Sequence, residues 1–412
     1  METHISNTVD SLKDDIIQFL RELIQIPSEN PKGDYEEICL FLQTKMMSFG
    51  FEVQLIEVPF EEVSKRNLQK PRKSVIATLK GKDRGKRLIF NAHIDTVPAD
   101  DNSKWRNGPF SGHIENGKIY GRGATDCKGR LASYIMAAVT LQKADIPFDG
   151  DIIIAATCDE EIGGEFGAKY VTENKIVQGD MAVVEGYSNM IIRAMAGIMN
   201  LKISVAGKPA HSGYKWQGIN AIEKMSKCIE ALMELQSELE NEKSSIQGMN
   251  YTTLNIGVIK GGTKINVVPG SCEIDIDFRV IPEHTLDGVF LRVEQVLRKL
   301  QEQDHELEIQ IDRLRGFETN PTVVEENSPL ITELQKAVRE VSGKELPVVG
   351  VLGQSDARYF IEQGIPTINY GPGTNQNNLH GFNEFIEIDD LIETTKVLAT
   401  FSKNILQKGE GI

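Results

Sequence analysis

Six side chains that could hold metal ions or move protons stand where β-strands of this sequence are expected to end. They are two histidines and four carboxylates: His93, Asp126, Glu160, Glu161, Glu185 and His380. Imidazole and carboxylate groups are ligands that zinc and similar divalent ions prefer. Five ligands and one spare carboxylate are too many for a single tetrahedral ion. We therefore expect two ions that share a bridging ligand, together with a general base.

His93 and Asp95 lie two residues apart at the end of a predicted strand, so their side chains share a face. A metal-bound imidazole usually donates its other N–H to an acceptor, and the Asp95 carboxylate would fix the tautomer in this way. The alternative is a buried histidine whose partner is a local aspartate. The two residues alone do not separate these interpretations.

Asp126 ends the word GRGATD at residues 121–126. The word resembles a dinucleotide-binding fingerprint, but its sixth position is Asp instead of Gly, and no strong strand leads into it. We reject the phosphate-loop interpretation. A carboxylate can span two cations with its two oxygens, so Asp126 is a candidate bridge. The alternative is an N-cap for the helix predicted at 129–142.

Glu160 and Glu161 follow the strongest buried-strand signal of the chain, and Glu185 ends the next strand in the same manner. Carboxylates beside an apolar strand are costly unless they are paired or coordinated. Neighbouring residues on an extended backbone point in opposite directions, so the two glutamates should have different roles. One would bind metal and the other would act on water, and the spacing does not say which. A solvated turn is the alternative for all three.

The elements that must position these residues are short apolar strands at 74–80, 86–94, 151–158 and 181–185, alternating with helices. This pattern predicts an α/β fold with a mostly parallel sheet flanked by helices, and a site beyond the carboxyl ends of its strands. Helices are also expected at 9–24 and 35–49.

From residue 194 the order changes to β-α-β-β-α-β, which predicts a second, ferredoxin-like domain at 194–313. It would be inserted into a catalytic metal-binding domain formed by 1–193 and 314–412. The open edges of such a sheet favour a homodimer.

Composition narrows the possible partners. The formal net charge of −15 opposes binding to nucleic acid. The five cysteines are odd in number and form no CxxC motif, which is typical of a reducing compartment. The N-terminal segment lacks an export pattern, and no apolar run approaches the ~20 residues that span a bilayer. We expect a cytoplasmic protein without a membrane partner.

Taken in order, the motifs resemble those of the dinuclear zinc amidohydrolase family that includes acetylornithine deacetylase, succinyl-diaminopimelate desuccinylase, aminoacylase and glutamate carboxypeptidase. The resemblance covers essentially the whole chain. It rests on HIDTVP, GRGATDCKG, DEEIGG, GKPAHSG, INVVPG, GQSDARYF and GPGTNQNNLHGFNE. Each motif is weak alone, and the ordered set is specific.

The resemblance implies a role for each residue, with two Zn²⁺ as cofactors and Co²⁺ or Mn²⁺ as substitutes. His93 and Glu185 would hold one ion, Glu161 and His380 the other, and Asp126 would bridge them. Glu160 would be the general base and Asp95 the partner of His93. The resemblance also implies that the inserted domain is a lid and dimerisation domain, from which His211 would stabilise the oxyanion in its own or the partner subunit. Asn266, Arg358 and, more weakly, Arg279 would contact the substrate, with structural salt bridges as the alternative for both arginines.

The implied activity is hydrolysis of the amide bond of an N-acyl amino acid by a zinc-activated water, as in the deacetylases and desuccinylases. A dipeptidase or carboxypeptidase acting on a short peptide is the second prediction. Many family members have a proline after the lid histidine, where this chain has Tyr214, Lys215 and Trp216, so the substrate side chain stays undefined. A non-catalytic binding relative is the alternative of another class, and retention of all five ligands and Glu160 argues against it.

Overall fold

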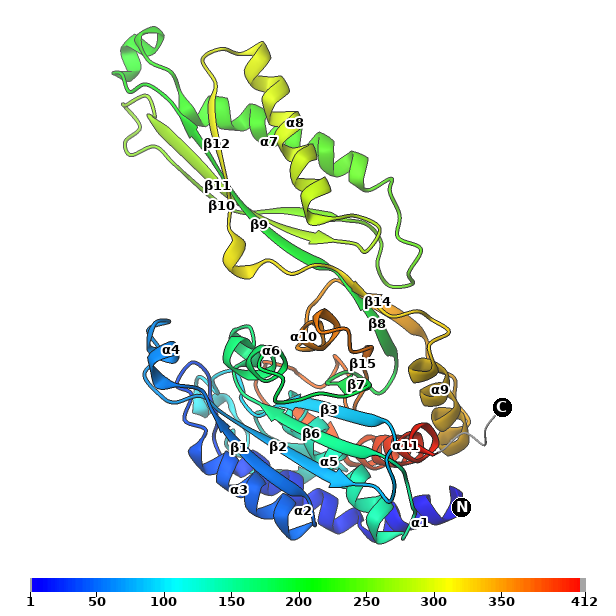
Figure 1. The fold of residues 1–412 in the computed structure, drawn as a ribbon. Helices are drawn as coiled ribbons and strands as arrows, with labels where there is room; N and C mark the ends of the chain where they lie inside the picture. Colours follow the sequence, from blue (N-terminus) through cyan, green and yellow to red (C-terminus); the bar gives the residue numbers. More distant parts are fainter. Residues whose placement is uncertain (1, 408–412) are drawn as a thin grey trace. The chain divides into compact units, whose positions relative to one another are not determined.

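The structure is a computed structural model and describes residues 2–407. The chain forms two compact units (Figure 1). The first combines the chain up to Arg193, Val324–Val348 and the chain from Ser355 onward, and the second combines Ala194–Val323 and Val349–Gln354. The second unit runs past the predicted end at 313 because Thr319 pairs with Ile198, each backbone N–H bonding the other's carbonyl at 3.1 and 2.9 Å.

The core of the first unit is a sheet whose central strands are parallel. From one edge, the first six of its nine described strands are β1 (Glu52–Glu57), β2 (Lys73–Lys80), β6 (Asp151–Thr157), β3 (Arg87–His93), β7 (Met181–Val184) and β15 (Thr367–Asn369). Strands β6, β3, β7 and β15 run parallel, whereas β1 and β2 are antiparallel additions at one edge. The central strands are almost completely buried, as continuous apolar strands in a covered sheet should be. The predicted fold class is confirmed.

Helices cover both faces of this sheet (Figure 1). One face carries α2 (Lys13–Gln25), α3 (Glu36–Ser48), α5 (Lys128–Lys143) and α11 (Ile388–Leu406), and the other carries α6 (Tyr170–Glu173) and α10 (Ala357–Glu362). Outside this layer, α1 (Glu2–Ser11) and α9 (Pro329–Ser342) pack on α11. The single helix predicted at 9–24 is two helices, because Leu12 leaves helical geometry with φ −93° and ψ 2°.

The parallel strands deliver three of the predicted residues to one edge of the sheet. His93 is the last residue of β3, Glu185 follows the last residue of β7, and Glu160 comes three positions after the end of β6. Because carboxyl ends of parallel strands meet at the same edge, residues distant in sequence become neighbours there.

A small antiparallel sheet joins two further segments. Its order is β16 (Phe385–Glu387), β5 (Lys118–Tyr120) and β4 (His113–Glu115), and Phe385 pairs with Tyr120. This pairing places the chain just before Asp126 against the chain just after His380. Shorter elements complete the description: α4 (Phe60–Ser64), β8 (Ile191–Met195), β13 (Thr322–Val323) and β14 (Val348–Val351).

The second unit has the predicted ferredoxin-like order. It consists of β9 (Gly197–Ala206), α7 (Ala221–Leu239), β10 (Thr253–Gly261), β11 (Ser271–Val280), α8 (Leu286–Gln303) and β12 (Glu308–Arg313). The antiparallel strand order is β10-β11-β9-β12, with α7 and α8 on one face (Figure 1). Burial alternates along β9 and β11, so one face of each strand packs on the helices. No helix within residues 2–407 is both long and apolar enough to cross a membrane.

Candidate metal and catalytic site

The Asp126 carboxylate lies between two histidines of the first unit. Its Oδ1 is 3.2 Å from Nε2 of His93, and its Oδ2 is 3.2 Å from Nε2 of His380. The ligand atoms of Asp126, Glu161 and His380 lie within 4.8 Å of one another, as do those of His93, Asp126 and Cys127. Each carboxylate oxygen therefore faces a different candidate ligand set, as a bridge between two ions requires.

Asp126 does not cap the following helix. The N-cap position of α5 is Cys127, and no side chain caps the helix there. The Asp126 carboxylate instead accepts a 2.9 Å hydrogen bond from Arg130. Burial alone would raise the pKa of Asp126. This effect is outweighed by hydrogen bonds from His380 and His93 and by the charge of Arg130, which hold the pKa well below its usual range. The carboxylate is ionised, as a metal ligand must be.

His93 is buried and bonds to Asp95 through the backbone. Its Nδ1 lies 2.9 Å from the Asp95 carbonyl oxygen and 3.7 Å from the nearer carboxylate oxygen. Because a carbonyl can only accept, Nδ1 carries a hydrogen, and Nε2, which faces Asp126, is the nitrogen that would bind a metal ion. The sequence predicts that the carboxylate fixes this tautomer, whereas the carbonyl makes the shorter contact.

The Asp95 carboxylate holds the turn that bears the two glutamates. It accepts hydrogen bonds from the backbone N–H groups of Glu160 at 3.3 Å and Glu161 at 3.2 Å, and from the Asn30 amide at 2.6 Å. Burial raises the pKa of Asp95 to about 7. Asp95 thus connects the end of β3 to the residues that follow β6.

Glu160 and Glu161 lie in a 3₁₀ turn, Glu160–Ile162, and not on the extended backbone that the sequence predicts. Side chains of neighbouring residues in such a turn diverge by about 120°, so they still point to different places. The Glu161 carboxylate is 3.4 Å from Nε2 of His380. Burial raises the pKa of Glu160 well above its ordinary value.

Only glycine fits at one end of this turn. Gly164 has φ +69°, and a Cβ there would lie 2.3 Å from Oδ1 of Asp356. The second glycine of the DEEIGG motif therefore allows the turn to approach Asp356 closely.

Glu185 is buried, and one of its oxygens accepts the backbone N–H of Asp356 at 3.3 Å. Within residues 2–407, its Oε2 has no hydrogen-bond partner, and neither has Oε1 of Glu161. Burial raises the pKa of Glu185 to about 8. Buried carboxylate oxygens without donors are costly, and divalent cations would satisfy both. The donor set of two imidazoles and three carboxylates therefore fits a two-metal site.

Arg358 is nearly buried at the start of α10. Its guanidinium donates to the Gly163 carbonyl at 2.9 Å and to the Tyr359 hydroxyl at 3.1 Å, and its Nε has no hydrogen-bond partner in the described part of the chain. It holds the turn that follows the glutamates. Contact with a substrate stays a prediction for this residue.

The other predicted residues belong to the second unit. His211 is exposed, and its Nδ1 accepts the Gly213 N–H at 3.0 Å, so Nε2 carries the hydrogen in the neutral ring. The Ser212 N–H donates to the Asn266 carbonyl at 3.1 Å, which places Asn266 beside His211 with an exposed side chain. Arg279 donates to Asp277 at 2.9 Å, the structural role that its sequence leaves open.

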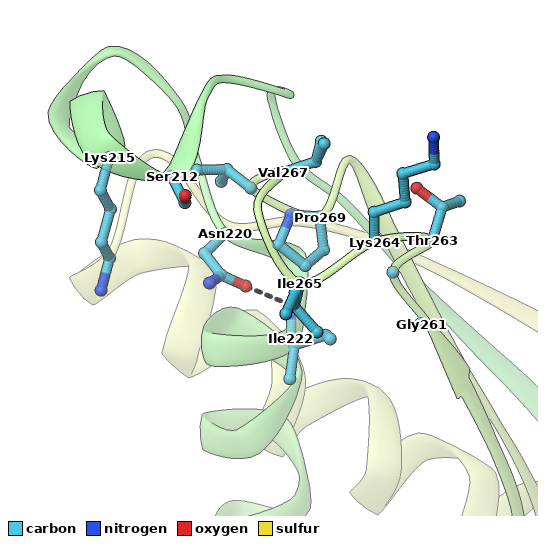
Figure 2. Close-up of a pocket in the computed structure, with 12 residues that line it drawn as sticks. Ser212, Lys215, Asn220, Ile222, Gly261, Thr263, Lys264, Ile265, Val267 and Pro269 are labelled. Carbon is cyan, nitrogen blue, oxygen red and sulfur yellow. Dashed lines mark hydrogen bonds between the residues drawn. The ribbon is translucent and has the colours of Figure 1, made fainter.

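A pocket of about 550 Å³ borders these loops in the second unit (Figure 2). Its walls include Lys215, Lys264, Ile222, Ile265 and Pro269, together with Ser212 and Val267, which directly follow His211 and Asn266. Ile222 N–H donates to Asn220 at 3.0 Å, drawn as a dashed line, at the start of α7. The pocket lies next to the predicted lid residues and contains none of the candidate metal ligands.

Sequence patterns miss the buried network behind the glutamate turn. Asp159 accepts hydrogen bonds from Tyr35 at 2.7 Å, Arg72 at 2.6 Å and Asn30 at 3.2 Å. Asn30 also bonds to Asp95, so the network joins Asp159, which precedes the turn, to the carboxylate that accepts the Glu160 and Glu161 N–H groups. The residues of this network come from segments far apart in sequence. The acidic run DEE is the only local sequence feature that points to the network.

Residues 89–404 match the peptidase family M20/M25/M40. The chain belongs to this family. Members of the M20 family are metal-dependent enzymes that act on amide bonds, so this M20 chain is a metal-dependent hydrolase, as its motifs predict. The suspected resemblance is confirmed, because acetylornithine deacetylases and succinyl-diaminopimelate desuccinylases are among its relatives.

Three curated relatives show the range of the match. The M20 chain is 28% identical over 419 residues to an N-formyl-4-amino-5-aminomethyl-2-methylpyrimidine deformylase of Halalkalibacterium halodurans, with 95% of each chain covered. It is 30% identical to the acetylornithine deacetylase of Aliivibrio salmonicida, covering 83% of this chain and 86% of that one. It is 29% identical to the succinyl-diaminopimelate desuccinylase of Cupriavidus necator, covering 84% and 88%.

Solved structures share the fold. Aminopeptidase PepT from Bacillus cereus matches with a TM-score of 0.75 at 22% identity, covering 95% of this M20 chain and 98% of that one. The YXEP protein of Bacillus subtilis, described as a dinuclear metal-binding peptidase of the M20 family, matches with a TM-score of 0.66 at 18% identity, covering 96% and 99%.

Proposed function

We propose that this chain is a dinuclear zinc hydrolase that removes a small acyl group from the nitrogen of an amino acid. The observation that carries the proposal is the Asp126 carboxylate, whose two oxygens each lie 3.2 Å from a different histidine. A carboxylate that serves one ion or a helix cap has no need of this arrangement.

The ligand assignment follows from the neighbours of Asp126. Glu161 lies beside His380, so these two would hold one ion. His93 and Glu185 end adjacent parallel strands and would hold the other. The bound ions would polarise the scissile carbonyl and make an attacking water more acidic.

Glu160 is proposed as the general base, which takes a proton from the attacking water and delivers it to the leaving amine. Its backbone is held by Asp95, and its neighbour Glu161 faces His380. That division leaves Glu160 as the carboxylate of the turn that is free for proton transfer.

His211 is proposed to stabilise the oxyanion from the lid. Nδ1 of His211 accepts a hydrogen bond from the Gly213 N–H, so the exposed Nε2–H is available as a donor. Asn266, beside it, and Arg358 are the proposed substrate contacts, whereas Arg279 is already paired with Asp277. The open edges of the β10-β11-β9-β12 sheet support a homodimer, and the acidic net charge argues against nucleic-acid partners. The five cysteines, which form no CxxC motif, support a cytoplasmic enzyme.

The relatives support deacylation, because those named above are a deformylase, a deacetylase and a desuccinylase. Dipeptidase or carboxypeptidase activity is the second candidate, and the structural neighbours include peptidases.

Two measurements test the proposal. Elemental analysis of the zinc-reconstituted protein should approach two ions per chain, and clearly less than one contradicts the site. A hydrolysis screen should compare N-formyl, N-acetyl, N-succinyl and N-carbamoyl amides with dipeptides. Turnover confined to dipeptides would replace the deacylase assignment with the second candidate.

A further inference from the structure

We infer that Glu384 is a positioning residue that sets the separation of Asp126 and His380 by tying their two loops together through Arg122. The inference rests on the proposed two-ion site. Neither residue is a candidate ligand, because each contacts a ligand residue through its backbone: Glu384 accepts the Asp126 N–H, and Arg122 donates to the His380 carbonyl.

Glu384 is completely buried and has four donors on its carboxylate. One oxygen accepts the backbone N–H groups of Thr125 at 2.9 Å and Asp126 at 3.0 Å. The other accepts the Gly123 N–H at 3.1 Å and the Arg122 guanidinium at 2.9 Å. Hydrogen bonds to a buried carboxylate are strong, so this side chain fixes the backbone from Arg122 to Asp126.

Arg122 extends the same connection to the second histidine. It is 1% exposed, and its other terminal nitrogen donates to the His380 carbonyl at 3.2 Å and the Pro98 carbonyl at 3.3 Å. Its guanidinium also lies over the Trp105 ring, 5.1 Å from the centroid. The ion pair therefore contacts the Asp126 loop and the His380 loop at once.

The His380 loop needs such support. His380, Asn378 and Asn383 have φ values of +59°, +56° and +55°, which L-residues rarely adopt. Such conformations persist only where the surroundings determine them. The Arg122 bond to the His380 carbonyl is one such determinant, and the Gly121 N–H bond to the Glu384 carbonyl at 2.9 Å is another.

This arrangement predicts unequal effects on the two ions. Loss of the Glu384 carboxylate frees the His380 loop, so the ion held by Glu161 and His380 should weaken most. The ion held by His93 and Glu185 shares only the bridging Asp126 with these loops and takes its other two ligands from strand ends that Glu384 does not touch, so it should weaken less.

Glu384→Gln tests this by cobalt titration of the metal-free protein in competition with a chelator, followed by visible absorption. The amide that replaces the carboxylate would face N–H groups on both sides. Only its oxygen can accept hydrogen bonds, so the donors on the other side would lose their acceptor. We expect wild type to bind two ions per chain and the variant to keep one near wild-type affinity. The second should be at least roughly tenfold weaker, the effect typical of lost support around a metal ligand.

Two further variants keep the test decisive. Arg122→Lys keeps the charge and one bond to Glu384 but loses the fork that reaches His380, so it should show the same selective loss if Glu384→Gln does not fold. Leu398→Ala removes buried volume from α11 in the same core, so it should lower the melting temperature without changing the ratio of the two affinities.

Unchanged affinities in Glu384→Gln overturn the inference, as does an equal loss at both sites. Both results leave the proposed function intact, because wild type would still bind two ions. A wild-type protein that binds less than one ion contradicts the proposed function itself, whatever the variants do.

Discussion

Nδ1 of His93 lies 2.9 Å from the backbone carbonyl oxygen of Asp95, closer than it lies to the Asp95 carboxylate. The carboxylate is engaged elsewhere, by Asn30 and by the backbone N–H groups of the glutamate turn. Asp95 thus has two tasks, and different atoms perform them.

Replacement of Asp95 by Asn separates those tasks. The backbone carbonyl remains, so His93 should keep its tautomer and the protein should still bind two zinc ions. The glutamate turn loses one of the two Asp95 carboxylate oxygens that accept its backbone N–H groups, so kcat should fall about 10- to 100-fold. Metal analysis beside steady-state kinetics checks this. Loss of the ions would mean that the carboxylate orients His93.

Glu160→Gln should retain both ions and lose about 10²- to 10⁴-fold in kcat, because the amide cannot accept a proton from water. Glu165→Gln is a matched control a few residues along the chain. Its partner is Arg66 on the surface, so its turnover should stay near wild type. A near-normal rate in Glu160→Gln removes the residue from proton transfer.

His211→Ala should lower kcat about 10²-fold with unchanged zinc content, because it deletes one donor to the oxyanion. His305→Ala replaces another exposed histidine of the second unit and should have no effect. If the two variants are kinetically alike, His211 has no role in the reaction.

The Arg72–Asp159 pair is buried, with 0% and 1% side-chain exposure and a separation of 2.6 Å. Arg72→Met leaves a buried carboxylate without its cation and should reduce the free energy of unfolding by about 3–5 kcal/mol. The same change at Arg66, whose pair with Glu165 is largely exposed, should leave the free energy of unfolding nearly unchanged. Denaturant unfolding of both variants measures the difference, and equal losses would contradict the assignment.

Asp304 gives the second unit an acid-sensitive contact. Hydrogen bonds from Lys224 and Lys227 lower the pKa of Asp304 to about 2 from an ordinary value of 3.8. A carboxyl group whose pKa is lower in the folded than in the unfolded protein stabilises the fold at pH values above its unfolded pKa. For Asp304 this stabilisation is lost as the pH falls through 3.8 toward 2. Asp304→Asn should therefore lower the free energy of unfolding by about 1 kcal/mol at pH 7 and by roughly half of that at pH 3. The figure for pH 7 is discounted for solvent screening because Lys227 is half exposed. Urea unfolding at the two pH values tests this, and a cost that grows on acidification has the wrong sign.

Much of the fold could be predicted from local pattern. Continuous apolar runs mark β3, β6 and β7, and alternating burial along β9 and β11 follows the period of a half-covered sheet. The break at Leu12 escaped prediction because the apolar spacing continues across it while the backbone turns away.

By itself, the sequence determined which side chains could bind metal and that three of them follow parallel strands, because both properties depend on residue type and local periodicity. Tertiary structure decided how those side chains meet. Asp126 faces two histidines, and the Asp95 carbonyl orients His93. Glu384 joins two loops because it accepts the backbone N–H of Asp126, 258 residues away in sequence. A hydrogen bond has a range of about 3 Å, so its partners are known only once distant segments have been brought together.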